Sequence, residues 1–435
     1  MKVVGLITEY NPFHNGHKYH IEQARKITGA DYCVAVMSGD FVQRGTPAVM
    51  DKYSRTKMAL NNGVDLVLEL PVCYATGSAE YFAHGAISIL DKLGVINTLC
   101  FGSECGDISL LSKAAQFLLH TPESFENQLQ DYMRAGLTYP AARQKAFVQS
   151  MGEPNPSDRQ SLSKILTEPN NILGIEYSKA LIKLSSPIEP ITIQRISAHY
   201  HDKELSDRTS YTSNDPTLCD SVISSATAIR NTINQQSKLS SDAIATAAES
   251  VPEDVAKYLL DHYHVTYPIT EEDFSQILKY KLRQEDSTSL AKYLDVTPDL
   301  ADRLKNIRDI NMPFHSLVQE IKTKNMTLTR INRALLHILL NIKTETVKQY
   351  ITTDFTPYAR VLGIRKEATP LLRHIEKHGR ISIISKVSKA EDELDTLGKQ
   401  MLSEDIFAAD IYNQAVYQKY GTSLQNEYKH GICLV

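Results

Sequence analysis

The first 110 residues alternate short apolar runs with longer stretches in which apolar residues recur at helical spacing. This alternation constrains the fold more than any other feature. Each apolar run is too short for a helix and rich in β-branched residues, which is typical of a buried strand. Strands are expected at 2–7, 31–37, 65–70 and 96–101, and helices at 17–28, about 52–61 and about 78–93. The order strand, helix, strand, helix predicts an α/β fold with a doubly wound parallel sheet.

A polar or glycine-bearing loop follows three of these runs, and Pro71 follows the remaining one. The loops are residues 11–17, 38–40 and 102–104. Because ligands bind beyond the carboxyl ends of the strands in an open α/β sheet, the loops are expected to form a site together.

The loop after the first run contains His14 and His17, three positions apart, where a strand gives way to a helix. A helix N-terminus presents unpaired N–H groups and partial positive charge, which suit phosphate. The imidazole N–H groups can reach the same anion, and Gly16 allows a phosphate or a flat base to approach the backbone. The pattern predicts a site where both histidines stabilise charge on a pentacoordinate α-phosphate during nucleotidyl transfer. The alternative is a pair of solvated loop histidines.

The rest of the chain divides into three expected regions. Helical patterns cover 108–151, a helix follows Pro169, a strand is expected at 188–196, and another helix begins near Ser224. After about residue 236 the pattern is helical, and the last 80 residues mix a short α/β signal with an acidic tail. The sequence therefore predicts domains at 1–235, 236–352 and 353–435, the last a small α/β region.

Composition restricts the class of protein. The apolar content of 42% and charged content of 23% are ordinary for a globular protein. The six cysteines contain no C-x-x-C pair and no His/Cys cluster, so reduced thiols and no structural zinc are expected. No stretch is long enough to span a membrane and no signal peptide is visible, which favours a cytoplasmic location. The net charge of −4 excludes a globally basic coat but allows a local basic patch.

Four longer motifs carry a resemblance. They are G-L-I-T-E-Y-N-P-F-H-N-G-H at 5–17, M-S-G-D-F-V-Q-R-G at 37–45, F-G-S-E at 101–104 and P-N-N-I-L-G at 169–174. H-N-G-H resembles the HxGH signature of the Rossmann-like nucleotidyltransferase superfamily. Together the motifs resemble the bacterial tRNA(Met) cytidine acetate ligase family.

This resemblance implies a reaction. The family activates acetate with ATP to acetyl-AMP, then acetylates N4 of the wobble cytidine in elongator tRNA(Met) to give N4-acetylcytidine. An acid–AMP-forming ligase is therefore expected, with ATP as substrate and Mg²⁺ as cofactor. The first domain would bind ATP, and the helical domain would contact tRNA.

The resemblance also implies roles for individual residues. His14 and His17 would be catalytic. ATP would be held by Gly102, Asn170 and Arg195 and by the loop residues Ile7, Thr8, Glu9, Tyr10, Asn11, Pro12, Phe13, His14, Asn15, Gly16, His17, Lys18, Tyr19 and His20. From the residues alone, Asn170 could instead cap a helix and Arg195 could be a surface charge.

Residues 225–230 resemble the I-S-S-T-x-x-R element of nucleotidyltransferases, with Ala226 in place of the second serine. Ser225, Thr227 and Arg230 are therefore candidate phosphate ligands, because Arg binds phosphate in a bidentate manner and a helix start adds its dipole. The alternative is an ordinary Ser/Thr helix cap.

Further candidates have weaker support. Ser38, Asp40 and Arg44 follow the second strand and are candidate substrate or tRNA contacts. Asp40 could orient the ribose, the acyl group or Mg²⁺, and Arg44 could meet phosphate or tRNA; the alternative is a simple turn. On the next expected helix, Arg55 and Lys57 are interpreted as solvated.

Residues 301–350 contain nine Lys/Arg and four acids, a local net charge of +5. Within them Arg330 and Arg333 lie three apart, a spacing suited to contact with tRNA phosphates. A solvated helix face is the alternative. Two other functions also remain open: a small-molecule adenylyltransferase, or a non-catalytic RNA-binding protein with a nucleotide-sensing fold.

Overall fold

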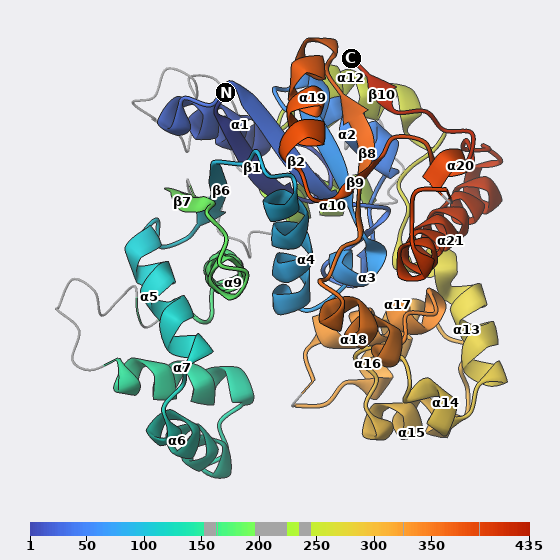
Figure 1. Cartoon of the computed structure of the whole chain (residues 1–435). Helices are drawn as coiled ribbons and strands as arrows, with labels where there is room; N and C mark the ends of the chain where they lie inside the picture. The colour runs from blue at the N-terminus through green and yellow to red at the C-terminus, as the bar shows by residue number, and fades with distance from the viewer. Residues whose placement is uncertain (152–161, 163, 196–223, 235–244, 325, 391) are drawn as a thin grey trace.

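The computed structural model describes residues 1–151, 162, 164–195, 224–234, 245–324, 326–390 and 392–435. Within them, eight strands form one sheet in the order β10-β8-β5-β2-β1-β6-β7, with β9 paired to β8 (Figure 1). The five N-terminal strands of this sheet are β1 (Val3–Thr8), β2 (Tyr32–Ser38), β5 (Leu66–Leu70), β6 (Thr98–Ser103) and β7 (Glu189–Gln194). They are all parallel. The predicted parallel sheet is confirmed.

The strand β1 lies at the point where the strand order reverses, with β2 on one side and β6 on the other. The chain leaves β2 toward β5 in one direction and β6 toward β7 in the other. In open α/β sheets the crevice at such a point holds the ligand. The loop after β1 is therefore positioned for binding.

Successive side chains of the strands point to opposite faces of the sheet, and each face packs against its own hydrophobic core. Along β2, Val34 and Val36 join one hydrophobic cluster, while Cys33, Ala35 and Met37 join the other. The first cluster is covered by α4 (Ala79–Lys92), α5 (Ile108–Leu119) and α9 (Pro169–Lys183), and the second by α1 (Asn15–Thr28) and α2 (Lys52–Asn61). This two-residue period fixes the strand register, because a slip by one residue would exchange the faces.

Local capping explains where these helices begin. The Asp51 carboxylate accepts hydrogen bonds from the N–H groups of Tyr53 and Ser54 and starts α2, and the Ser78 hydroxyl accepts one from Tyr81 and starts α4. The first helix ends at Gly29, whose φ of 60° is left-handed. The helical pattern expected at 108–151 forms three helices, α5, α6 (Glu123–Arg134) and α7 (Tyr139–Ser150), which are separated by residues 120–122 and 135–138.

The C-terminal residues extend the same sheet. The strand β8 (Tyr358–Ile364) pairs antiparallel with β5, and β9 (Ser382–Ile384) and β10 (Cys433–Leu434) pair parallel with β8. The long helix α21 (Thr396–Tyr420) lies between β9 and β10 in the chain. The proposed domain boundaries stay a prediction, and the boundary at 235/236 lies outside the described residues.

The central region is helical. Its helices α13, α15, α16, α17 and α18 group together at the lower right of Figure 1. The elements are α12 (Glu253–His262), η2 (Glu271–Phe274), α13 (Ser275–Gln284), α14 (Ser287–Leu290), α15 (Pro298–Asn306), α16 (Phe314–Ile321), α17 (Leu328–Leu339) and α18 (Thr344–Thr352). Among these helices, α17 contacts β4 (Thr46–Pro47), which forms a hairpin with β3 (Phe41–Val42), and α12 contacts α2. Gly45 in this hairpin has a φ of 74° and lies directly against the Arg333 backbone.

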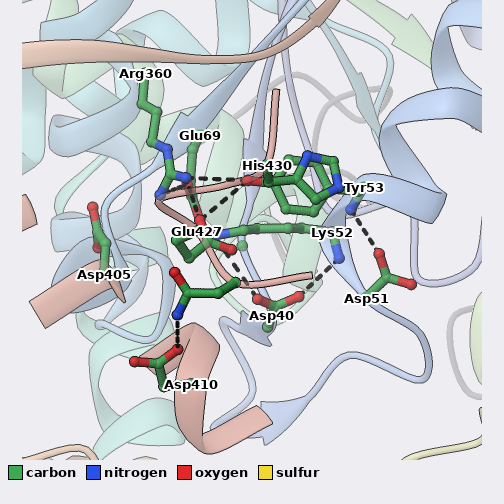
Figure 2. A network of polar contacts seen from close by, with 12 residues as sticks. Asp40, Asp51, Lys52, Tyr53, Glu69, Arg360, Asp405, Asp410, Glu427 and His430 are labelled. Atoms are coloured by element: carbon green, nitrogen blue, oxygen red, sulfur yellow. Dashed lines mark hydrogen bonds and ion pairs between the residues drawn. The ribbon is translucent and has the colours of Figure 1, made fainter. Parts of the chain in front are cut away.

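Five buried charged side chains connect the C-terminus to the sheet (Figure 2). Lys52 Nζ lies 2.8 Å from Glu69 Oε1 and 3.1 Å from Glu427 Oε2. Arg360 on β8 contacts both carboxylates, at 3.0 Å from Glu69 Oε2. Asp40 completes this buried network by accepting a 2.8 Å hydrogen bond from the Lys52 main-chain N–H.

Glu427 is the C-terminal member of the buried network. It is 1% exposed although its neighbours Asn426 and Tyr428 are exposed. Burial opposes ionisation, but the charges of Lys52 and Arg360 hold the pKa of Glu427 at about 2. The turn after α21 therefore inserts an anion between two buried cations.

We expect Glu427→Ala to lower the free energy of unfolding by roughly 3–5 kcal/mol, because two buried cations lose a shared partner. Urea denaturation at pH 7 measures this change. The control is Glu376→Ala, the same substitution at an exposed position on α19 (Thr369–His378), which should cost less than about 0.5 kcal/mol. Superimposable unfolding curves for Glu427→Ala and the unsubstituted protein would contradict the expectation.

Candidate active site

The two histidines of the loop after β1 are brought together at the start of α1. His14 is the N-cap residue of the helix and is buried. Its ring stacks on that of His17 with centroids 3.6 Å apart and an interplanar angle of 25°. The main-chain N–H of His14 donates to His17 Nδ1 at 3.3 Å. In a neutral His17 ring the proton therefore lies on Nε2, which makes that atom a hydrogen-bond donor.

Aromatic residues of the same loop fix these rings. Tyr10 and Phe13 are fully buried, and their ring centroids lie 4.9 and 5.6 Å from that of His17. Asn11 is also buried, and its side-chain oxygen accepts a 2.8 Å hydrogen bond from Val49 N–H. These three side chains face the interior. Of residues 7–20, the half-buried or exposed ones are Ile7, Thr8, Glu9, Asn15, Gly16, His17, Lys18, Tyr19 and His20.

Burial keeps the histidines neutral at pH 7. It lowers the pKa of His14 to about 3, with smaller contributions from the charges of Arg195 and Arg230. Burial also lowers the pKa of His17 well below its usual value, and that of His20 to about 4. The site therefore offers neutral N–H donors surrounded by arginines, an environment that favours an incoming anion.

Arg230 reaches the same loop from α10 (Ala226–Asn234). Its Nη1 donates to the Asn11 carbonyl at 2.6 Å, and its Nη2 donates to Thr227 Oγ1 at 3.1 Å. Ser225 Oγ accepts a 3.1 Å bond from the Ala228 N–H, which is the helix-cap role weighed for it from the sequence. Burial and the charge of Arg44 lower the pKa of Arg230 to about 10. Arg44 and Arg230 therefore form a second positive group beside the histidines.

The third group of candidates lies at the ends of β6 and β7. Arg195 follows β7, and its main-chain N–H donates to the Ser103 carbonyl at 2.9 Å. A Cβ at Gly102 would lie 3.3 Å from the Arg195 side chain. Asn170, in the first turn of α9, donates its side-chain amide to Glu104 Oε1 at 2.6 Å. Gly102, Asn170 and Arg195 thus come together although they are far apart in the chain.

Glu104 lies in the loop 102–104 that is expected to contribute to the site, but its sequence position alone indicates no particular role. Its carboxylate also accepts the main-chain N–H groups of Asn170 and Asn171, at 3.2 and 2.8 Å. Glu104, rather than Asn170, therefore caps α9 and orients the Asn170 side chain. The signal was present, since Glu104 is the last residue of the F-G-S-E motif.

The candidates after β2 are divided by the structure. Ser38 and Asp40 are buried, and the Asp40 carboxylate faces Lys52 within the buried network (Figure 2). Burial, opposed by the charge of Lys52, raises the pKa of Asp40 to about 7. Arg44 is half-buried, and the charge of Glu9 acts on it. Arg44 therefore lies near Glu9 in the loop after β1, whereas the Asp40 side chain is paired inside the protein.

Arg330 and Arg333 differ in their surroundings. Arg333 Nε lies 2.9 Å from Asp295 Oδ2, and its side chain is only 12% exposed. Arg330 is half-buried in the first turn of α17. The interpretation of Arg55 as solvated is wrong, because this residue is fully buried, whereas Lys57 is exposed as expected.

Fold and site together define a class of protein. A parallel sheet with paired histidines at its first turn is matched over residues 1–427 by the family model for HIGH Nucleotidyl Transferase. Proteins called tRNA(Met) cytidine acetate ligase from Acetivibrio thermocellus and Clostridium novyi are each 38% identical to this chain. They cover 95% and 96% of it, and 94% and 96% of their own lengths. The chain belongs to the tRNA(Met) cytidine acetate ligase family, so the resemblance carried by the motifs is confirmed.

Solved structures agree. The crystal structure of Thermotoga maritima TmcAL bound with alpha-thio ATP matches with a TM-score of 0.85 and 30% identity. The apo form of the same protein matches with a TM-score of 0.87. Both comparisons cover 100% of each chain. No helix among the described residues is long and apolar enough to cross a membrane.

The lowered pKa of His14 makes stability depend on pH. Its folded pKa of about 3 lies below the unfolded value of 6.5, so the unfolded chain binds more protons as the pH falls through that range. We expect the free energy of unfolding to fall between pH 7 and pH 5 by about 1–2 kcal/mol more in the unsubstituted protein than in His14→Asn. Urea denaturation at both pH values gives the comparison. Equal losses in the two proteins would contradict the expectation.

Proposed function

We propose that this protein activates acetate with ATP to form acetyl-AMP and then acetylates N4 of the wobble cytidine in elongator tRNA(Met). The observation that carries the proposal is the neutral, stacked pair His14 and His17 at a helix N-terminus, beside Arg230, at the sheet's reversal point. Membership of the tRNA(Met) cytidine acetate ligase family supports the choice of substrates.

In the first step an acetate oxygen attacks the α-phosphorus of ATP in line, and the bond to pyrophosphate breaks. The N–H groups of His14 and His17 donate to the α-phosphate oxygens as negative charge develops there. Because the free rings are neutral, they bind the nucleotide as hydrogen-bond donors.

In the second step the cytidine N4 attacks the acetyl carbonyl carbon, AMP leaves, and N4 loses a proton. This step forms an amide and needs no acetyl-CoA. The unpaired base must enter the site, so the anticodon stem-loop has to lie against the protein surface near the sheet edge.

We propose that three groups of residues bind the nucleotide. The loop of residues 7–20 would hold the α-phosphate, Gly102, Asn170 and Arg195 would hold the nucleoside side, and Ser225, Thr227 and Arg230 would meet the outer phosphates. Arg44 is placed to add charge there. Mg²⁺ would enter on the ATP phosphates, since it keeps several waters and few protein ligands. Among the described residues no group of three His, Cys, Asp or Glu could hold a metal ion.

The helical region is the proposed tRNA contact because residues 301–350 carry a net charge of +5. Arg330 is the better candidate there, since Arg333 is already paired with Asp295. Ser38 and Asp40 are assigned to shaping the loop rather than touching tRNA, because both are buried. A cytoplasmic location follows from this substrate.

One assay separates this proposal from its two rivals. Protein, labelled ATP, acetate and total tRNA are incubated together. Acetate-dependent pyrophosphate release with acetylated tRNA(Met) supports the proposal. Pyrophosphate release that needs a different acceptor would favour a small-molecule adenylyltransferase, and tRNA binding without turnover would favour a non-catalytic protein.

We expect His14→Ala and His17→Ala each to lower acetate-dependent pyrophosphate release by about 10²–10³-fold, the usual cost of losing one donor to a transition-state oxyanion. His378→Ala, at an exposed position on α19 outside the proposed tRNA surface, is the control and should keep full activity. Full turnover in a folded double variant lacking both imidazoles would overturn the proposed role of the pair.

We expect Arg330→Glu to reduce acetylation of tRNA(Met) by about tenfold or more at 0.1 M salt, because a phosphate contact becomes a repulsion. Acetate-dependent ATP–pyrophosphate exchange without tRNA should be unchanged. The matched control is Arg373→Glu, at an exposed position on α19 outside the proposed tRNA surface. Equal tRNA acetylation by both variants would argue against a tRNA contact at Arg330.

A further inference from the structure

We propose that Arg55 is a positioning residue of the adenylation site: its guanidinium fixes the loop after β1 to the loop after β2. The inference rests on the proposed function only for its activity readout. Arg55 lies in α2 and is 0% exposed. It therefore cannot touch a substrate and must act through the backbone that it holds.

The guanidinium of Arg55 donates to four main-chain carbonyls from three segments. Nη1 donates to Glu9 O at 2.6 Å and to Ser38 O at 3.1 Å. Nη2 donates to Gly39 O, and Nε donates to Met50 O at 3.1 Å. Within the described part of the chain no carboxylate forms an ion pair with Arg55. A planar fork of fixed N–H donors is suited to holding several carbonyls at once.

Two of these carbonyls belong to the residues that come directly after the paired part of β1 and β2. The parallel pairing of β1 with β2 ends at Thr8 and Met37. The next pair in register would be Glu9 and Ser38, and these are the two residues whose carbonyls share Arg55 Nη1. The hydrogen bonds of Arg55 thus connect the two chains directly after the β1–β2 pairing ends. Arg55 keeps the two chains side by side as they turn into the loops that form the site.

The loop of residues 38–40 is held on its other side by the buried network. Asp40 accepts a hydrogen bond from the Lys52 main-chain N–H (Figure 2). A Cβ at Gly39 would lie only 2.5 Å from Glu69 Oε1, so the loop has no room to move toward Glu69. The loop is therefore confined between Glu69 and Arg55.

A second link joins the loop after β1 to the segment that follows β2, and it includes two hydrogen bonds: the Gln43 N–H donates to Glu9 Oε1 at 2.8 Å, and the Val49 N–H donates to Asn11 Oδ1 at 2.8 Å. This link does not involve Arg55 and would persist without it. Loss of Arg55 should therefore loosen the geometry of the site without separating the loops. The carbonyls of Glu9, Ser38 and Gly39 would each lose a buried donor.

The test compares Arg55→Ala with Lys57→Ala, an exposed basic residue two positions along the same helix. For Arg55→Ala we expect kcat for acetate-dependent ATP–pyrophosphate exchange to fall about 100-fold, the scale associated with misplacement by about 1 Å. The KM for ATP should change less than threefold, because α1, α9 and α10 still supply its contacts. Lys57→Ala should match the unsubstituted protein.

Chemical rescue separates positioning from general damage. Guanidinium at a non-denaturing millimolar concentration should fill the space left in Arg55→Ala and restore kcat at least tenfold, whereas it should not restore His14→Ala. A folded Arg55→Ala with unchanged kcat, or one that guanidinium does not rescue, would overturn the inference. If Arg55→Ala does not fold, Arg55→Lys takes its place: it keeps the charge but loses the fork, so unchanged kcat in this variant would also overturn it.

A second readout does not depend on the reaction. Amide hydrogen exchange at residues 9–13 and 38–45 should accelerate in Arg55→Ala and slow again with guanidinium, while exchange in α21 stays unchanged. If the unsubstituted protein shows no acetate-dependent exchange of pyrophosphate, the proposed function fails but this readout still decides the role of Arg55. Unchanged amide exchange at both loops would refute it.

Discussion

The parallel pairing of β1 on both of its edges is the constraint on which the rest of the structure depends. With β2 and β6 on either side, the chain leaving β1 must emerge in the crevice between two diverging halves of the sheet. Its side chains alternate between two cores, so Val3 belongs to one and Val4 and Leu6 to the other. That arrangement sets both the register of β1 and the place where His14 and His17 begin α1.

Burial then determines the chemistry available at that place. Desolvation and the neighbouring positive charges lower the pKa of both histidines, so at pH 7 the positive charge of the site comes from Arg44, Arg195 and Arg230. Neutral donors beside fixed cations suit a reaction in which phosphate charge moves from the α-phosphate to pyrophosphate. The charges of the buried network lie apart from this site. Asp40, Lys52 and Glu69 compensate one another inside the protein instead of facing a ligand.

Much of the fold and part of the site could be predicted from local sequence. The expected strands at 31–37 and 96–101 appear as β2 and β6 with ends shifted by one or two residues, and the expected helix at 52–61 appears unchanged as α2. Periodicity and capping residues encode such elements directly. The interpretation of Arg55 as solvated is wrong, and the sequence indicates no role for Glu104. In both cases the reason is that main-chain partners come from segments distant in sequence.

By itself, the sequence determined the parallel sheet, the helix that starts at the paired histidines, and the family, because these depend on short-range patterns and contiguous motifs. Only the tertiary structure decided that β8 and β10 extend the sheet of the N-terminal strands, that Glu427 binds Lys52 and Arg360, and that Arg55 joins two loops. The physical reason is that a buried charge or carbonyl must find a partner wherever folding brings one. The number of residues between two groups in the chain does not indicate how close they lie in the folded protein.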